Sequence, residues 1–161
     1  MKRLLTLLLL VVAIATGANA QLNKIYEKCQ KEGNLTTVFV SKAMLQMAGN
    51  MGPMDAGNLA QLKDKIDNVL IVTADNSKGI NFLTKLRKEF TQKTGYSSLM
   101  EINDDKSNVV IFQKKLPDNK NEFVLSIIQK SRPTMIVIDG DITLEDVAKM
   151  AGQNGKIPTG K

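Results

Sequence analysis

The chain has 161 residues, with 22 Lys or Arg against 16 Asp or Glu, so its formal net charge is +6 at neutral pH. It contains no His, no Trp and a single Cys, Cys29. These counts exclude a Ser-His-Asp triad, a Cys-His pair and an internal disulfide. The basic residues are scattered among acids and do not alternate with aromatic residues, so nucleic-acid binding is not expected.

The first twenty residues have the pattern of a secretory signal peptide. Lys2 and Arg3 precede an apolar run over residues 4–15, and the segment ends in Ala18-Asn19-Ala20. Cleavage after Ala20 would make Gln21 the first residue, lower the net charge to +4 and leave no cysteine there for lipidation. We therefore expect a periplasmic or secreted protein that is not inserted in the membrane after cleavage.

Residues 21–152 are predicted to form one α+β domain, followed by a polar tail over residues 153–161. The first helix is expected over residues 22–32 and should end at Gly33. An apolar stripe at i, i+3, i+4 and i+7 marks its buried face: Leu22, Ile25, Tyr26 and Cys29. This spacing predicts a buried and unreactive Cys29, with an intermolecular disulfide or a reactive thiol as the alternative.

Residues 35–41 are rich in β-branched residues and predict a strand, which is followed by a stretch with four methionines. This stretch, MLQMAGNMGPM over residues 44–54, predicts a helix that the segment from Gly49 to Pro53 interrupts. The spacing of its methionines favours packing in the core or at an interface. The alternative is a Cu(I) site, because thioethers are soft ligands, and its ligands would be Met44, Met47, Met51 and Met54.

A second helical piece is expected over residues 59–66, before a strand at residues 69–74 whose continuous apolar run indicates a central position in a sheet. Asp75-Asn76-Ser77 then predicts the start of a helix that ends at Gly95. Its apolar stripe consists of Ile80, Leu83, Leu86 and Phe90.

The remainder of the chain predicts four successive strands and a last helix. Short polar connections favour an antiparallel meander, with Asp104 and Asp105 as turn residues. Thr143 is expected to cap the last helix, and Asp146 to complete a capping box. The element order predicts an α+β fold in two layers, a largely antiparallel sheet with helices packed on one face. The four strands are predicted at residues 98–103, 108–114, 122–129 and 134–139.

The stretch around Asp139 resembles a catalytic motif. Asp139-x-Asp141-x-Thr143 follows an apolar strand, as in the first motif of the haloacid dehalogenase-like phosphotransferases. In that family a lysine and further metal-binding acids follow over a long stretch, whereas here only 18 residues follow Thr143. The nucleophile would lack these groups, so we interpret the motif as a strand end and a helix cap.

Calcium binding and glycoside hydrolysis are two further chemistries that carboxylates can support. An EF-hand loop starting at Asp139, with Asp141, Thr143 and Glu145, needs glycine at its sixth position and glutamate at its twelfth, and those positions hold Leu144 and Met150. A glycosidase that uses carboxylates alone fits the composition, but two Tyr and no Trp offer little for stacking sugars. No catalytic, cofactor-binding or metal-binding residue is therefore predicted.

Several segments together resemble one family. The turn Gly140-Asp141-Ile142 and the pair Leu99-Met100 are the most telling of them, in the context of VFVSKAML, KIDNVLIVTADN, YSSLMEINDDKSNVVIFQKK, NEFVLSIIQK and IDGDITLEDVAKM. In order and spacing they resemble domain of unknown function family 4252, which consists of small exported bacterial proteins. The resemblance implies export and one α+β domain, and it assigns no activity to any residue.

The sequence as a whole predicts a non-catalytic, exported binding or interaction module of the cell envelope, without cofactors. Its partner would be an unidentified protein of the envelope, and its contact surface the methionine helix and the loop that follows. The alternative function is Cu(I) binding through residues 44–54.

Overall fold

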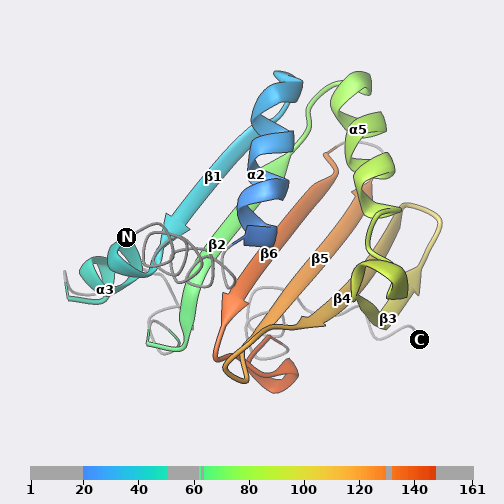
Figure 1. Cartoon of the computed structure of the whole chain (residues 1–161). Coiled ribbons are helices and arrows are strands. Elements are labelled where there is room, and N and C mark those ends of the chain that lie inside the picture. Colours follow the sequence, from blue (N-terminus) through green and yellow to red (C-terminus); the bar gives the residue numbers. More distant parts are fainter. Residues whose placement is uncertain (1–19, 51–61, 63, 130–131, 148–161) are drawn as a thin grey trace, which may run out of the picture.

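The computed structural model describes residues 20–50, 62, 64–129 and 132–147. Six strands form one antiparallel sheet in the spatial order β1-β2-β6-β5-β4-β3 (Figure 1). With the helices that pack against it, this sheet confirms the predicted α+β class. The strands are β1 (Thr36–Ser41), β2 (Ile66–Thr73), β3 (Ser97–Asn103), β4 (Ser107–Lys115), β5 (Asn121–Gln129) and β6 (Thr134–Gly140).

Helical segments connect or flank these strands. They are α2 (Ala20–Glu32), α3 (Lys42–Asn50), α5 (Ser77–Arg87), the 3-10 turn η1 (Gln92–Thr94) and a helical stretch over residues 144–147. Among the described residues, no helix has the length and apolar character that crossing a membrane requires.

The predicted meander is confirmed, because β3, β4, β5 and β6 are neighbours in that order. The segment containing α5 carries the chain from β2 to the far edge of the sheet, and the meander then returns until β6 lies beside β2. Asp104 forms the first hairpin turn, since its carboxylate accepts hydrogen bonds from the main-chain N–H groups of Lys106 and Ser107, each at 2.7 Å. Its predicted role in a turn is therefore confirmed.

The helix boundaries follow local chemistry, with two differences from prediction. Gly33 ends α2 in the left-handed conformation, with φ of 69°, and the Asn76 side chain caps α5 by accepting from the Gly79 N–H at 2.9 Å. However, α5 ends at Arg87, and Phe90 reaches the core from the loop beyond it. The second helical piece also ends earlier than predicted, because Ile66 is already a buried strand residue of β2.

The main hydrophobic core lies between the sheet and the helices α2 and α5, on the side that we call the helix face. Side chains from these helices and from alternate positions of the strands fill it, and the Phe90 and Tyr96 rings meet edge to face at 4.9 Å. Its largest fully buried members include Tyr96, Leu22, Leu70, Leu83 and Met135.

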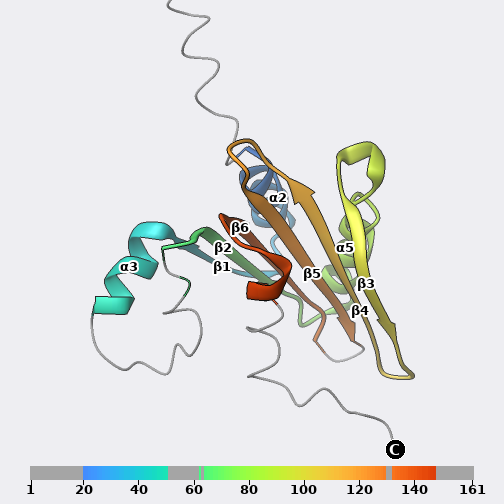
Figure 2. The same ribbon diagram turned by 90° about the horizontal axis from the view of Figure 1, so that it is seen from below.

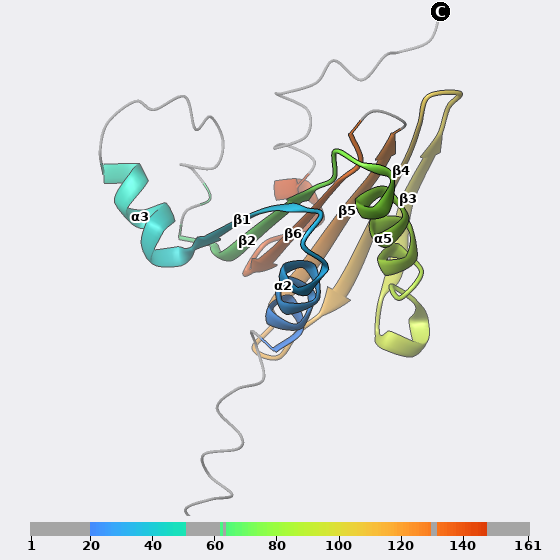
Figure 3. The same ribbon diagram turned by 90° about the horizontal axis from the view of Figure 1, so that it is seen from above.

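A smaller core lies on the opposite side of the sheet, which we call the open face. Here Ile66, Phe123 and Ile138 pack together with Ile142, which precedes the last helix, and with Val147 from that helix. Figures 2 and 3 show α2 and α5 on one side of the sheet and the helical stretch 144–147 on the other. The expected arrangement of helices on one face therefore describes α2 and α5 but not the last helix, because Val147 belongs to the smaller core with Phe123.

The start of the last helix has the predicted capping box. The Asp146 carboxylate accepts from the Thr143 N–H at 3.0 Å, and the Asp146 N–H donates to the Thr143 hydroxyl at 3.2 Å. Lys65 adds an ion pair to Asp146 at 3.2 Å. The predicted end of this helix, the polar tail and the predicted signal peptide of residues 1–20 lie outside the described residues, except for Ala20.

Candidate functional site

The register of the sheet aligns apolar side chains across the open face. Because paired residues of adjacent antiparallel strands present their side chains on the same side, the pairings can be followed from edge to edge. They give one continuous row with a residue from every strand, which we call the apolar row: Met100, Ile111, Leu125, Ile136, Ile71 and Val38. With strands about 4.8 Å apart, the row spans about 24 Å.

The apolar row remains partly accessible to solvent. Val38 and Met100, at its two ends, are each 48% exposed, and the neighbouring Ile102 is 43% exposed. Between these ends, Ile111 is buried and Leu125, Ile136 and Ile71 are half-buried against the smaller core. Exposed large apolar side chains that gather on one face of a protein are typical of an interaction site.

Charged side chains avoid the middle of the open face. In the strands, Glu101, Glu122, Asp139 and Lys114 fall at positions that face α2 and α5. Lys115, at the end of β4, is the strand lysine whose register position lies on the open face. This arrangement reverses the usual pattern of a one-sided sheet, in which the uncovered face carries the polar residues.

The methionines of α3 extend the accessible apolar surface beyond the sheet. Met44 is 62% exposed and Met47 is 63% exposed, while Leu45 packs against the smaller core. The prediction that these two methionines pack in the core is therefore wrong. Their packing at an interface remains a prediction. Met51 and Met54 lie outside the described residues.

A second aligned set crosses the helix face at the end of the sheet near the start of α2. Cross-strand pairing places one polar residue from each of five strands side by side, and we call this set the polar row: Ser41, Asn68, Asp139, Glu122 and Lys114. Glu122 is 0% exposed and Asp139 is 1% exposed, although both side chains are ionisable.

Each buried carboxyl group of the polar row has one neutral donor. The Asn68 amide donates to Asp139 at 3.0 Å, and the Tyr96 hydroxyl donates to Glu122. The second carboxyl oxygen of Glu122, Oε2, is buried and has no hydrogen-bond partner among the described residues. The Lys114 ammonium, opposite Glu122 in β4, lies 5.2 Å from the centre of the Tyr96 ring.

Burial dominates the electrostatics of this region. It raises the pKa of Asp139 to about 6, although the Asn68 hydrogen bond acts in the opposite direction. It also raises the pKa of Glu122, to which the Asp139 charge adds, while the Tyr96 hydrogen bond lowers it. The pKa of Tyr96 is raised by burial and by the Glu122 charge.

The residues of the phosphotransferase-like motif do not converge. Asp139 is buried in the polar row, Asp141 is exposed, and Thr143 is engaged with Asp146. In the described ranges, no three His, Cys, Asp or Glu side chains are grouped as a metal ion would require. Cys29 is buried, which raises its pKa to about 11, as expected for an unreactive thiol.

Sequence reasoning did not identify the polar row or the apolar row. Both depend on the pairing of strands that are far apart in the chain, since β6 lies between β2 and β5. The sequence did contain one indication of the polar row. Glu122 and Asp139 are acids that each lie near an end of a mainly apolar strand. Such positions become informative once their partners across the sheet are known.

Comparison with known proteins gives one match. Residues 26–150, which make up more than half of the chain, match the family described as "Domain of unknown function (DUF4252)". Neither the curated proteins nor the solved structures provide a match. The segments that carried the resemblance lie within the matched range, and the chain therefore belongs to the DUF4252 family.

Proposed function

We propose that this protein is an exported, non-catalytic binding module of the cell envelope, periplasmic or secreted. Export is supported by the charged, apolar and small-residue order of residues 1–20. The absence of catalysis is supported by the state of its acids, since Asp139 and Glu122 are buried and hydrogen-bonded and Asp146 caps a helix.

The observation that carries the binding function is the apolar row on a face without central charges. A partner that presents charged groups there would have to desolvate them without receiving an opposite charge. A partner with an uncharged apolar surface would instead gain from burial of Val38, Met100 and their neighbours. We therefore propose a protein partner whose contact surface is apolar and lacks charge, with Met44 and Met47 as adaptable contacts at the margin.

Placing a charge at the two ends of the apolar row tests this proposal. The chain of residues 21–161 would be cross-linked in an envelope fraction, and the captured protein identified by mass spectrometry and purified. Val38→Lys and Met100→Lys are each expected to weaken binding of that protein at least about tenfold, because an ammonium would be buried without a partner.

Asn81→Lys provides the matched control, because Asn81 is exposed on α5, on the other side of the sheet. Its affinity for the captured protein should equal that of the wild type. Thermal unfolding of all three variants should be close to wild type, since Val38 and Met100 are already half-exposed. Equal binding by all three variants would show that the apolar row is not the contact surface.

Cu(I) binding is retained as a second candidate because Met44 and Met47, three residues apart, both present accessible thioethers on α3. Titration of the chain with Cu(I) should then give a stoichiometric complex that Met44→Leu with Met47→Leu abolishes. A chain that binds no Cu(I), with the same unfolding temperature in the presence and absence of the ion, would exclude this candidate.

A further inference from the structure

Glu122 occupies a position that leaves part of its carboxyl group without a partner. It is paired with Asp139 on one side and with Lys114 on the other, and its Oε1 accepts from the Tyr96 hydroxyl. Its Oε2 is buried without a hydrogen bond among the described residues. A buried carboxyl oxygen without a donor is costly, so this atom indicates a group that is missing from the polar row.

A positive charge would stabilise the two ionised acids more than a neutral hydrogen-bond donor would. Directly opposed residues on adjacent strands have Cβ atoms about 5 Å apart, so ionised Glu122 and Asp139 would repel each other. Two cations act on these acids through space, Lys114 on Glu122 and Lys120 on Asp139, but the contacts of their ammonium groups are with other residues. Lys114 places its ammonium over the Tyr96 ring, and Lys120 forms an ion pair with Asp67 at 2.6 Å.

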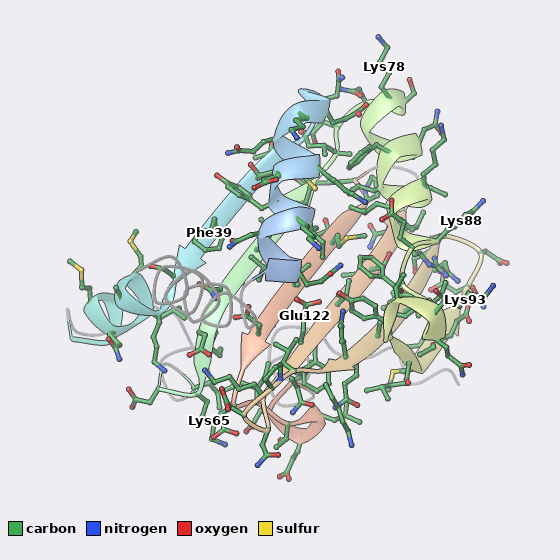
Figure 4. All side chains as sticks on the ribbon, viewed as in Figure 1. Phe39, Lys65, Lys78, Lys88, Lys93 and Glu122 are labelled. Carbon is green, nitrogen blue, oxygen red and sulfur yellow. The ribbon has the colours of Figure 1, made fainter. Side chains whose placement is uncertain are left out.

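The start of α2 is linked to Glu122 through Tyr96. Figure 4 shows Glu122 just beyond the first turn of α2, and α2 begins at Ala20. The side chain of the half-buried Gln21 hydrogen-bonds Tyr96, the same residue that donates to Glu122. The Tyr96 hydroxyl therefore links the side chain of Gln21 to Oε1 of Glu122, the same carboxyl group whose Oε2 has no partner among the described residues.

The predicted processing site falls at this position. Hydrolysis of the Ala20–Gln21 amide by an envelope endopeptidase adds one water molecule, so Ala20 leaves with a carboxylate and Gln21 keeps an amine. That amine is protonated at neutral pH in its ordinary state. The reaction thus creates a positive charge at Gln21, whose side chain is already linked through Tyr96 to the carboxyl group of Glu122.

We infer that Glu122 and Asp139 form a receptor for a primary ammonium group, and that its ligand is the α-amino group of Gln21 released by removal of residues 1–20. This inference rests on the proposed export. Formation of the ion pair would further stabilise the start of α2 only in the processed chain, because the uncleaved amide carries no charge. The helix dipole disfavours a cation at this end, so the carboxyl groups are needed to hold it.

The sharpest test measures the protonation of that amine. Chains that begin at Gln21 would be prepared by specific proteolysis, and the pKa of the α-amino group determined by NMR titration within hours of cleavage. The ion pair should raise the amine protonation constant at least about tenfold above that of a free N-terminus, and Glu122→Gln should remove most of this increase. Glu27→Gln, on the exposed side of α2, is the matched control and should leave it unchanged.

Stability gives an independent readout. Retaining Ala20 or acetylating the Gln21 amine should lower the unfolding temperature of the wild-type chain and have little effect on the Glu122→Gln chain. The carboxyl receptor is wrong if the amine pKa is the same in the wild type and Glu122→Gln, or if acetylation lowers both unfolding temperatures equally.

Cyclisation of the N-terminal glutamine supplies a third measurement. Loss of ammonia from Gln21 to form pyroglutamate requires an unprotonated amine, so an amine held by Glu122 should cyclise more slowly than in Glu122→Gln. The first residue of the chain recovered from the envelope is determined separately by mass spectrometry. A different first residue would exclude Gln21 as the natural ligand and would correct the processing site, whereas binding of a partner at the apolar row would be unaffected.

Discussion

At the scale of single residues, cross-strand pairing determines the chemistry of the acids more than their sequence context does. Asp139 ends an apolar strand in a phosphotransferase-like motif, yet it lies beside Glu122 and accepts from Asn68 in the polar row. Asp141, two residues along the chain, is exposed. The two acids of the motif therefore lie in different environments, and burial raises the pKa of Asp139.

Asp139→Asn is expected to change how stability depends on pH. The folded pKa of about 6 exceeds the ordinary value of 3.8, so the folded protein binds this proton more tightly than the unfolded chain. The contribution of Asp139 to the unfolding free energy is therefore greatest below about pH 4 and is lost as the pH rises through 6. The asparagine side chain does not titrate, so the variant lacks this loss. The unfolding free energy of the variant minus that of the wild type should therefore increase by about 2 kcal/mol between pH 4 and pH 7.

Urea unfolding at closely spaced pH values measures this difference. Other acids with lowered pKa values, such as Asp67 and Asp146, act in the opposite sense, but they are common to both chains and cancel in the comparison. A constant difference from pH 4 to pH 7 would mean that Asp139 does not titrate in this range.

Gly140 shows a second constraint that acts on one residue. Its φ is 147°, and a Cβ atom there would lie 2.1 Å from the main-chain oxygen of Lys65, which also accepts from the Asp141 N–H at 2.8 Å. Gly140→Ala should thus lower the unfolding free energy by at least about 2 kcal/mol. Gly33→Ala is the comparison, because its φ is 69° but nothing lies near its Cβ, so its loss should be smaller. Equal losses in denaturant unfolding would argue against the close approach at Lys65.

At the scale of elements, helix ends are set by local polar groups and strand ends by long-range pairing. Thr143 begins the last helix as predicted, and Asn76 begins α5 within the segment that was predicted as its start, because a cap acts within one turn. The start of β2 was misplaced, since Ile66 joins the strand by pairing with Gly140 far along the chain. Helix propensity alone carries no information on such a pair.

The cap of the last helix gives an element-scale prediction. Thr143→Ala removes the hydroxyl that accepts from the Asp146 N–H, and we expect a loss of about 1 kcal/mol in unfolding free energy. Thr143→Ser keeps the hydroxyl and should differ from wild type by only a few tenths of that amount. If both variants lose the same amount in denaturant unfolding, the methyl group of Thr143 and not its cap would be responsible.

At the scale of the whole molecule, the two faces of the sheet have different tasks. The helix face carries the main core under α2 and α5, together with the buried polar row. The open face carries the smaller core, and its apolar row, with one residue from each of the six strands, is exposed at the two ends. Stability therefore depends chiefly on the first face, and the second is available for the proposed partner.

A Leu→Ala substitution on each face compares how much the two faces contribute to stability. Leu70→Ala removes a fully buried side chain of the main core and should lower the unfolding free energy by about 3 kcal/mol. Leu125→Ala, in the apolar row, removes a half-buried side chain and should cost clearly less, about 1 kcal/mol. Chemical denaturation of the isolated chain measures both, and equal losses would indicate that the open face is covered in the isolated protein.

Much of the fold was accessible from local pattern. The stripe of Leu22, Ile25 and Cys29 identified the buried side of α2, and the four strand-like segments after Gly95 identified the meander. The candidate sites were less accessible. Their spacing places Met44 and Met47 on the same face of a helix, but spacing cannot decide whether that face contacts the sheet or solvent. In the structure Leu45 packs against the smaller core, and the two methionines are exposed.

The sequence by itself determined the elements, their order, the turn at Asp104 and the caps at Asn76 and Thr143, because each depends on contacts within a few residues. Only the tertiary structure decided that β6 lies between β2 and β5 and that the last helix covers the open face. That pairing brings Glu122 against Asp139 and joins Val38 to Met100 through a single apolar row. Strand register is a property of residues distant in sequence, and it therefore assigns the polar and apolar groups to their faces only when the whole sheet is assembled.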